Sequence, residues 1–264
     1  MWVNFGFIGA LSFILGFAMN HGSICTFVAT TELVLKRRPA RFLALAECAL
    51  WAAIAYVILE RQPTMHDGWA PLAHMIMAAI LLGVGVYVNG ACIFGSVGHF
   101  GNGELEFGLT FLGMIAILSL DTLFSVRSDP LPISGTPPLA LGSLLLGLAA
   151  FLVLRLGFSL RAETNYPRLT VAMATVGVTS ASLSSFASNF SITTSIGSLL
   201  WIPVTSSLIF VFMSSGSFIS ARSRRHRFSL SWPTWRSLLR RTVGGLLMGF
   251  GALLIPGGMT PFCS

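Results

Sequence analysis

Long uncharged stretches dominate this sequence of 264 residues and restrict its fold more than any other feature. Five segments without Asp, Glu, Lys or Arg together hold 164 residues: 1–31, 72–103, 130–154, 169–221 and 242–264. Charged residues make up 9% of the chain, whereas soluble domains carry about 25%. Since a helix of roughly 20 apolar residues crosses a bilayer, this pattern excludes a soluble enzyme, a disordered chain and a disulfide-rich scaffold. It predicts an all-α polytopic protein that lies in a lipid bilayer.

Eight segments have the length and hydropathy of transmembrane helices, and we expect eight or nine such helices plus short re-entrant ones. The predicted spans are 3–20, 42–60, 72–90, 105–120, 138–157, 168–186, 203–221 and 242–258. Together they form a single integral membrane domain over residues 1–264. The first 35 residues contain no Lys or Arg, so the basic region of a signal peptide is missing and the first span should stay in the mature protein.

The basic residues predict the orientation of these helices. When loop 36–41 is placed in the cytoplasm, 14 of the 16 Lys and Arg residues fall in or beside cytoplasmic loops, and the exceptions are Arg61 and Arg127. By the positive-inside rule, the N-terminus then lies outside. The same loops account for the net charge of +7, so nucleic acid is not expected as a partner.

Two uncharged segments fit a continuous spanning helix poorly. Residues 21–27 are too few to cross the bilayer again, and five of the fifteen residues in 89–103 are glycine. Each glycine costs a helix about 1 kcal/mol relative to alanine. Because irregular backbone at membrane depth is tolerated where it is buried in protein or lines a cavity, both segments are predicted to be broken or re-entrant elements. The Ser- and Thr-rich region 187–202 is interpreted in the same way.

Two parts of the chain echo each other at an offset of 166 residues, because residues 82–92 align with residues 248–258. Both are glycine-rich helices that run into a helix-breaking pair. Paired broken segments of this kind indicate the binding site of a transporter built from inverted repeats. The predicted halves are 1–120, which holds Cys25 and Cys92, and 138–264. The alternative is that these glycines serve close helix packing, and spacing alone does not decide between the two.

Three motifs carry a family resemblance. They are Gly16-Phe17 followed by Gly22-Ser23-Ile24-Cys25, then Asn89-Gly90-Ala91-Cys92-Ile93-Phe94-Gly95, and near the end Gly244-Gly245-Leu246-Leu247-Met248-Gly249-Phe250-Gly251-Ala252. In this order and over nearly the whole chain, they resemble the motifs of the YeeE/YedE family of sulphur-compound importers. The resemblance implies import of thiosulfate or a related small sulphur-containing anion through the bacterial inner membrane, with no cofactor. It also implies a cytoplasmic sulphur-carrier protein as a partner.

In that family, cysteine thiols line the constriction of the pathway. By motif, Cys25 and Cys92 correspond to two of these cysteines. The neighbouring residues expected to contact the anion are Gly22, Ser23, Asn89, Gly90, Gly257 and Gly258. A third family cysteine should follow Gly257, but Gly258 occupies that place and Cys263 lies five residues further on. Either Cys263 replaces it from a displaced position, or the protein works with two thiols.

The residue types in these motifs suit a soft anion. Neither motif segment contains Lys or Arg, which would hold an anion too tightly for release. Helix N-termini attract anions through the backbone N–H groups, and thiols add weak, polarizable donors. No metal site is expected, because structural zinc takes four ligands and the four cysteines form no C-x-x-C pair.

Two titratable residues, Glu47 and His21, are candidates for a proton relay. Glu47 lies inside the span 42–60, where a charged side chain costs at least about 2.5 kcal/mol and is usually functional. The alternative is a neutral Glu47 paired with a backbone group. His21 lies next to the first cysteine motif. Cys48, in the same span as Glu47, is interpreted as a small buried hydrophobic residue.

Three functions remain in competition. The broken segments favour a transporter, since a subunit that only anchors a complex does not require interrupted helices at membrane depth. A membrane thiol-disulfide oxidoreductase requires a reactive cysteine pair, and the sequence shows no local pair. A non-transporting membrane subunit is the third alternative. We therefore expect a transporter rather than an enzyme.

Overall fold

The computed structural model describes residues 2–23, 25–59, 72–124, 141–162, 166–186, 196, 203–223, 230 and 232–254. In this part of the chain the regular elements are all helices. They are α1 (Trp2–Gly22), α2 (Thr26–Lys36), α3 (Ala40–Ile58), α4 (Leu72–Asn89), α5 (Ile93–Gly101), the 3-10 helix η1 (Leu105–Phe107), α6 (Gly108–Phe124), α7 (Leu141–Ala162), α8 (Tyr166–Phe186), α10 (Pro203–Ser223) and α11 (Trp235–Leu253). The all-α class is thereby confirmed.

Each of the eight predicted spans corresponds to one helix. Within the described ranges, four apolar stretches are long enough to cross a membrane, namely Phe5–Lys36, Ala40–Ile58, Ala73–Gly101 and Pro167–Phe186. The last predicted span was placed too late, because α11 begins at Trp235 rather than at residue 242. The cause is a capping box, in which Thr234 Oγ1 accepts from the Ser237 N–H and the Ser237 hydroxyl accepts from the Thr234 N–H. This cap outweighs the three arginines in the first two turns, which hydropathy counts as loop.

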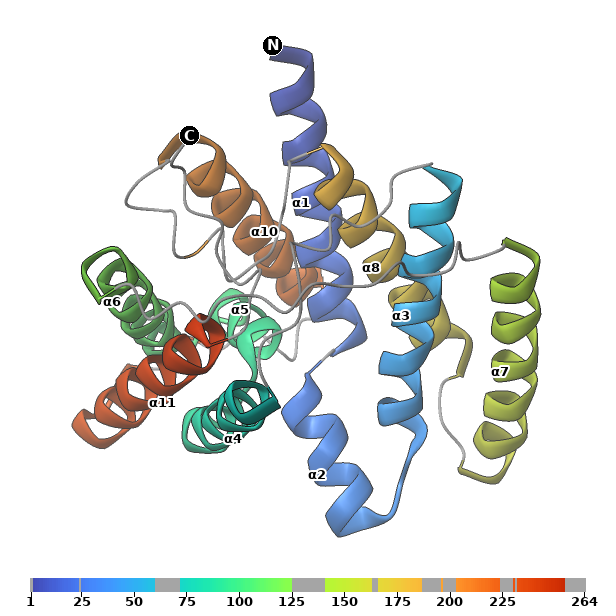
Figure 1. The fold of residues 1–264 in the computed structure, drawn as a ribbon, viewed down its shortest axis with the longest axis horizontal. Coiled ribbons are helices and arrows are strands. Elements are labelled where there is room, and N and C mark those ends of the chain that lie inside the picture. Colours follow the sequence, from blue (N-terminus) through green and yellow to red (C-terminus); the bar gives the residue numbers. More distant parts are fainter. Residues whose placement is uncertain are drawn as a thin grey trace.

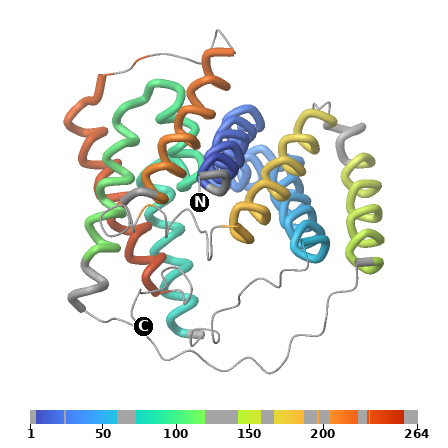
Figure 2. The backbone as a smooth tube through the Cα atoms, turned by 90° about the horizontal axis from the view of Figure 1, so that it is seen from above, coloured from blue at the N-terminus to red at the C-terminus, as the bar shows by residue number. Residues whose placement is uncertain are grey.

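The helices form two groups joined through α5 and α10. One group packs α1 against α8, α8 against α3 and α3 against α7, whereas the other packs α11 against α4 and α6. Helix α5 contacts α10, α1, η1 and α6 and lies in the middle of the molecule (Figure 1). The view from above shows the same division, with α7 at the outer edge of the first group (Figure 2). The central position of α5 places the glycine-rich segment between the two groups.

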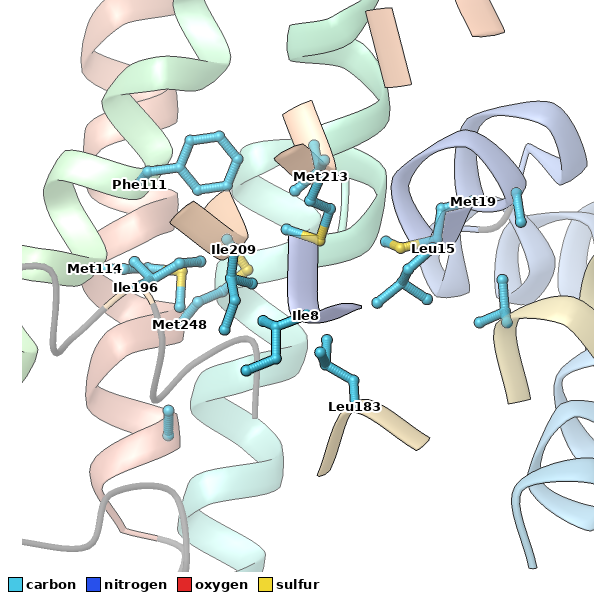
Figure 3. Close-up of a cluster of buried hydrophobic side chains, with 14 of the residues drawn as sticks. Ile8, Leu15, Met19, Phe111, Met114, Leu183, Ile196, Ile209, Met213 and Met248 are labelled. Carbon is cyan, nitrogen blue, oxygen red and sulfur yellow. The ribbon is translucent and has the colours of Figure 1, made fainter. Parts of the chain in front are cut away.

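The hydrophobic core lies where the two groups meet. Ile8, Leu15 and Met19 of α1 approach Met213 and Ile209 of α10 (Figure 3). On the other side, this cluster continues through buried side chains of α6 and α11, which are Phe111, Met114, Leu118 and Met248. Val97 of α5 belongs to this core, which thus holds α5 between the two groups.

Glycines allow the closest helix crossings. A Cβ on Gly16 of α1 would overlap the carbonyl oxygen of Met213, and one on Gly216 of α10 would overlap that of Phe13. A Cβ on Gly85 of α4 would lie 2.8 Å from the Met248 nitrogen of α11. The glycines of the two echoing segments thus pack α4 against α11, as the close-packing alternative predicts.

A buried ion pair attaches α7 to α3. Arg155 of α7 pairs with Glu47 of α3, and the two side chains are 2% and 0% exposed. Trp51 Nε1 donates a second hydrogen bond to Glu47, at 3.3 Å. The orientation argument had counted Arg155 among residues in or beside a loop, but helix α7 continues to Ala162 and buries it. The charge of Glu47 thus faces a guanidinium group rather than a backbone group.

Candidate functional site

Two helices break in the same way, each in front of a cysteine. After α1, Ser23 adopts a left-handed backbone with φ 51°, and Cys25 then stands at the N-cap position of α2, without a side-chain capping bond. After α4, Gly90 has φ 76°, and Cys92 caps the N-terminus of α5. In both breaks the left-handed residue stands two positions before the cysteine. The predicted broken segments are therefore present, and each presents a cysteine at a helix start.

The two breaks bring Cys25 and Cys92 into contact, with 3.6 Å between their Sγ atoms. Cys92 Sγ accepts hydrogen bonds from the N–H of Gly95, at 3.4 Å, and from the N–H of Thr26, at 3.3 Å. Gly95 belongs to the first turn of α5 and Thr26 is the first residue of α2. Two helix N-termini thus point at one sulphur atom, so both dipoles favour negative charge there.

The surroundings of the thiols are apolar. Cys25 and Cys92 are each 7% exposed and share a buried cluster with Ala91 and Phe107. Phe107 also stacks on His99, with 4.6 Å between ring centroids, and Arg241 Cζ lies 3.9 Å from its ring centre. The thiols therefore lie where two helix N-termini meet, beside an apolar cluster whose Phe107 carries the His99 and Arg241 side chains on its ring.

Two glycines of α5 stand where a side chain would clash with neighbouring residues. The prediction of a broken segment in 89–103 agrees with the structure, where α4 ends at Asn89 and the short helix α5 begins at Ile93. A Cβ on Gly95 would lie 2.6 Å from Cys25 Sγ, and one on Gly101 would overlap the Ser217 hydroxyl of α10. These glycines therefore give α5 its close contacts with the first cysteine break and with α10.

Buried hydrogen bonds of the Asn89 side chain stabilise the second break. Its amide nitrogen donates to the carbonyl oxygen of Ala91, at 2.8 Å, and to the Ser96 hydroxyl, at 2.9 Å. Its oxygen accepts from Thr110 Oγ1 of α6, at 2.8 Å. Asn89 is fully buried, so these bonds shape the backbone that presents Cys92. Contact of Asn89 with the anion stays a prediction.

Asn20 was missed by the motif comparison. Its amide nitrogen lies 3.0 Å from the Gly98 carbonyl oxygen, 2.9 Å from Asn102 Oδ1 and 2.9 Å from Ser217 Oγ. One buried side chain of α1 thus connects α5 with α10. The signal available in the sequence was an asparagine in an uncharged span, three residues before the break.

The structure gives some of the other predicted site residues different contacts, and the rest fall beyond the described residues. The His21 ring stacks on Phe17 near the end of α1, with 5.6 Å between centroids, and Glu47 is paired with Arg155. Gly22 ends α1, directly before Ser23. The predictions for Gly257, Gly258, Cys263 and the region 187–202 fall outside the described residues, apart from Ile196.

The described residues also bear on metal ligation and on Cys48. Among the described residues, no group of three His, Cys, Asp or Glu side chains lies together as metal ligands would. Cys48 is half-buried and packs against the hydrophobic core. This agrees with its interpretation as a small hydrophobic residue.

Comparison with known families supplies the remaining observation. A family model described as Sulphur transport matches the chain twice, over residues 21–136 and over residues 131–260. The chain belongs to this sulphur transport family. The first match begins at His21 and contains both cysteine breaks. No curated protein matches the chain. Membership agrees with the motif resemblance and with the apolar helices, so the chain is a membrane protein for the transport of sulphur compounds.

Proposed function

We propose that this protein imports thiosulfate, or a similarly small sulphur-containing anion, across the bacterial inner membrane through a constriction between Cys25 and Cys92. The observation that carries the proposal is the contact of the two thiols at 3.6 Å in front of two helix N-termini. Broken helices whose N-termini face an anion are the usual binding arrangement at the midplane of transporters.

The chemistry of the thiol pair suits passage rather than retention. An anion that leaves water must exchange its hydration for other donors, and the N–H groups of Thr26 and Gly95 already point at the sulphur of Cys92. S–H groups add weak donors that match a polarizable sulphur atom. The cluster around the thiols consists of apolar residues, and we expect an anion held without a fixed positive charge to bind weakly enough for release.

The direct test is uptake of radiolabelled thiosulfate by proteoliposomes. We expect Cys25→Ala and Cys92→Ala each to reduce uptake by about tenfold or more, since a hydrogen bond to a charged group contributes about 1.5–3 kcal/mol and 1.36 kcal/mol is tenfold in rate. Cys48→Ala is the matched control and should transport normally. Unchanged uptake by both site variants would contradict the role of the thiols.

We further propose the orientation and the repeat that the sequence predicts. The N-terminus lies outside, and the cargo is released to a sulphur-carrier protein in the cytoplasm. The double match of one family model, over 21–136 and 131–260, supports two related halves. Whether Cys263 supplies a third thiol is tested by Cys263→Ala in the same uptake assay, where loss of transport indicates that it does.

A second candidate function follows from the same contact. The sequence shows no local cysteine pair, but the fold brings two thiols within 3.6 Å, which is the reactive pair that a thiol-disulfide oxidoreductase requires. Alkylation of free thiols during turnover, followed by peptide mass spectrometry, separates the two functions. A transporter keeps both thiols reduced throughout, whereas an oxidoreductase accumulates the Cys25–Cys92 disulfide.

A further inference from the structure

Two guanidinium groups converge on the second cysteine break. An atom built as Cβ on Gly90 would lie 3.1 Å from Arg241 Nη1 and 3.6 Å from Arg240 Nη2. The two arginines are neighbours in α11, yet both side chains reach the same backbone segment beyond α4. Gly90 stands two residues before Cys92 and has the left-handed φ of 76°. Gly90 therefore permits the left-handed turn, and because it has no side chain, both guanidinium groups can approach the backbone there.

The ion pairs at this place leave one guanidinium group without a carboxylate among the described residues. Arg241 pairs with Glu106, through Nε at 3.2 Å and Nη2 at 2.8 Å, and the neighbouring Glu104 pairs with His99. Arg240 donates from Nε to the Val88 carbonyl oxygen, and within the described residues no carboxylate pairs with it. An anion that binds both guanidinium groups would therefore supply the partner that Arg240 lacks.

The nitrogen atoms closest to Gly90 are also the ones left for a ligand. Arg241 uses Nε and Nη2 in its bonds to Glu106, which leaves Nη1, and Arg240 uses Nε in its bond to Val88, which leaves Nη2. Planar guanidinium groups recognise oxyanions through such paired N–H donors. Two donors from different side chains, both close to Gly90, match the several oxygen atoms of a tetrahedral anion.

We propose that Arg240 and Arg241 form, with the Gly90 turn, a binding site for a small doubly charged oxyanion such as thiosulfate or sulfate. This inference rests on the proposed function, because it makes the arginines a second binding site on the anion's path, next to the thiols. Phe107 connects the two places, since it shares the cluster of Cys92 and lies under Arg241. In the proposed orientation the arginines lie at the cytoplasmic end of the pathway, so an imported anion reaches them after it has passed the thiols. Arg240 is exposed to solvent, which screens its charge and allows the anion to leave.

A lipid phosphate offers the same chemistry as a free oxyanion, so the test must separate these sources. The purified protein, in detergent free of phospholipid, is treated with the arginine reagent phenylglyoxal and analysed by peptide mass spectrometry. Sodium thiosulfate is compared with sodium chloride at equal ionic strength, and a third sample contains phosphatidylglycerol instead. Arg236, an exposed arginine one turn earlier in α11, is the internal control.

We expect thiosulfate to slow the modification of Arg240 and Arg241 several-fold and to leave that of Arg236 unchanged. Equal rates with thiosulfate and chloride, equal protection of Arg236, or protection by phosphatidylglycerol alone would each overturn the proposal. The Cys92→Ala protein should show the same protection as the native chain, which keeps this test independent of the thiol mechanism. Loss of protection in that variant would mean that no separate site exists.

Transport provides the second measurement. In proteoliposomes, Arg240→Gln should raise several-fold the KM for thiosulfate presented on the arginine side of the membrane, with little change in kcat, because Arg240 binds the anion at that end and not in the constriction. Arg236→Gln should leave both values unchanged. An unchanged KM for Arg240→Gln would contradict the inference, even if thiosulfate import itself is confirmed.

Discussion

Single residues determine whether the two thiols can touch, and Gly95 is the clearest case. It lies in the first turn of α5, and its N–H donates to Cys92 Sγ. A Cβ at this position would stand 2.6 Å from Cys25 Sγ and 3.2 Å from Cys25 Cβ. Such a contact requires Cys25 to move, although the N–H of residue 95 would stay in place.

Gly95→Ala should therefore separate the thiols and lower thiosulfate uptake by about tenfold, the scale of one hydrogen bond to a charged group. The matched control is Gly98→Ala in the same helix, where an added Cβ meets no atom within 4 Å. That variant should transport normally and be more stable by about 1 kcal/mol, since alanine favours helix over glycine. Uptake and thermal unfolding of both variants check this pair, and normal uptake by Gly95→Ala would contradict it.

The sequence identifies the cysteines but not all of their partners. Cys25 and Cys92 are visible because each sits in a motif with glycine. The Thr26 N–H that bonds to Cys92 comes from the folded backbone, and the guanidinium groups that reach Gly90 beside Cys92 come from a distant part of the chain. Arg240 and Arg241 count in the sequence as two more cytoplasmic charges, and nothing local shows that they meet Gly90.

At the level of helices, the buried pair of Glu47 and Arg155 governs how α7 joins the molecule. Helix α7 packs against α3 at the edge of its group, and the ion pair lies inside that contact. Breaking a buried pair by removing one partner leaves an unpaired buried charge, which costs about 3–5 kcal/mol. Replacing both partners with apolar residues removes the charge altogether.

We therefore predict that Glu47→Leu lowers stability strongly and that the double variant Glu47→Leu/Arg155→Leu recovers most of the loss. Unfolding of the detergent-solubilised proteins by heat or by sodium dodecyl sulfate measures both effects. Equal losses in the single and the double variant would contradict the ion-pair account. The double variant also tests the relay: normal thiosulfate uptake without Glu47 excludes it as a proton relay.

Helix positions follow well from the sequence, because hydropathy and length mark each span. The features that hydropathy does not show have local causes. Helix α11 starts early because Thr234 and Ser237 form a capping box. Helix α5 forms in spite of its glycines, since packing against Cys25 and α10 outweighs their intrinsic cost. Tertiary contacts of this kind are absent from a reading of hydropathy alone.

For the whole molecule, the positive-inside rule predicts one face for both basic clusters. Arg38 lies in the link between α2 and α3, and Arg222 lies in the last turn of α10, and both are exposed. In right-side-out spheroplasts, cysteines substituted at these two positions should resist a membrane-impermeant maleimide until the membrane is permeabilised. A cysteine at position 127 should react at once. Reaction of position 38 or 222 from outside would contradict the predicted orientation.

The passage of the anion between the thiols is the central claim, and a structure of the protein soaked with selenosulfate tests it most directly. Selenium replaces the outer sulphur of thiosulfate and is located by its anomalous scattering. The account predicts a selenium peak in contact with both Cys25 Sγ and Cys92 Sγ, close to the N–H groups of Thr26 and Gly95. A peak bound away from both thiols, in protein that transports the anion, would contradict it.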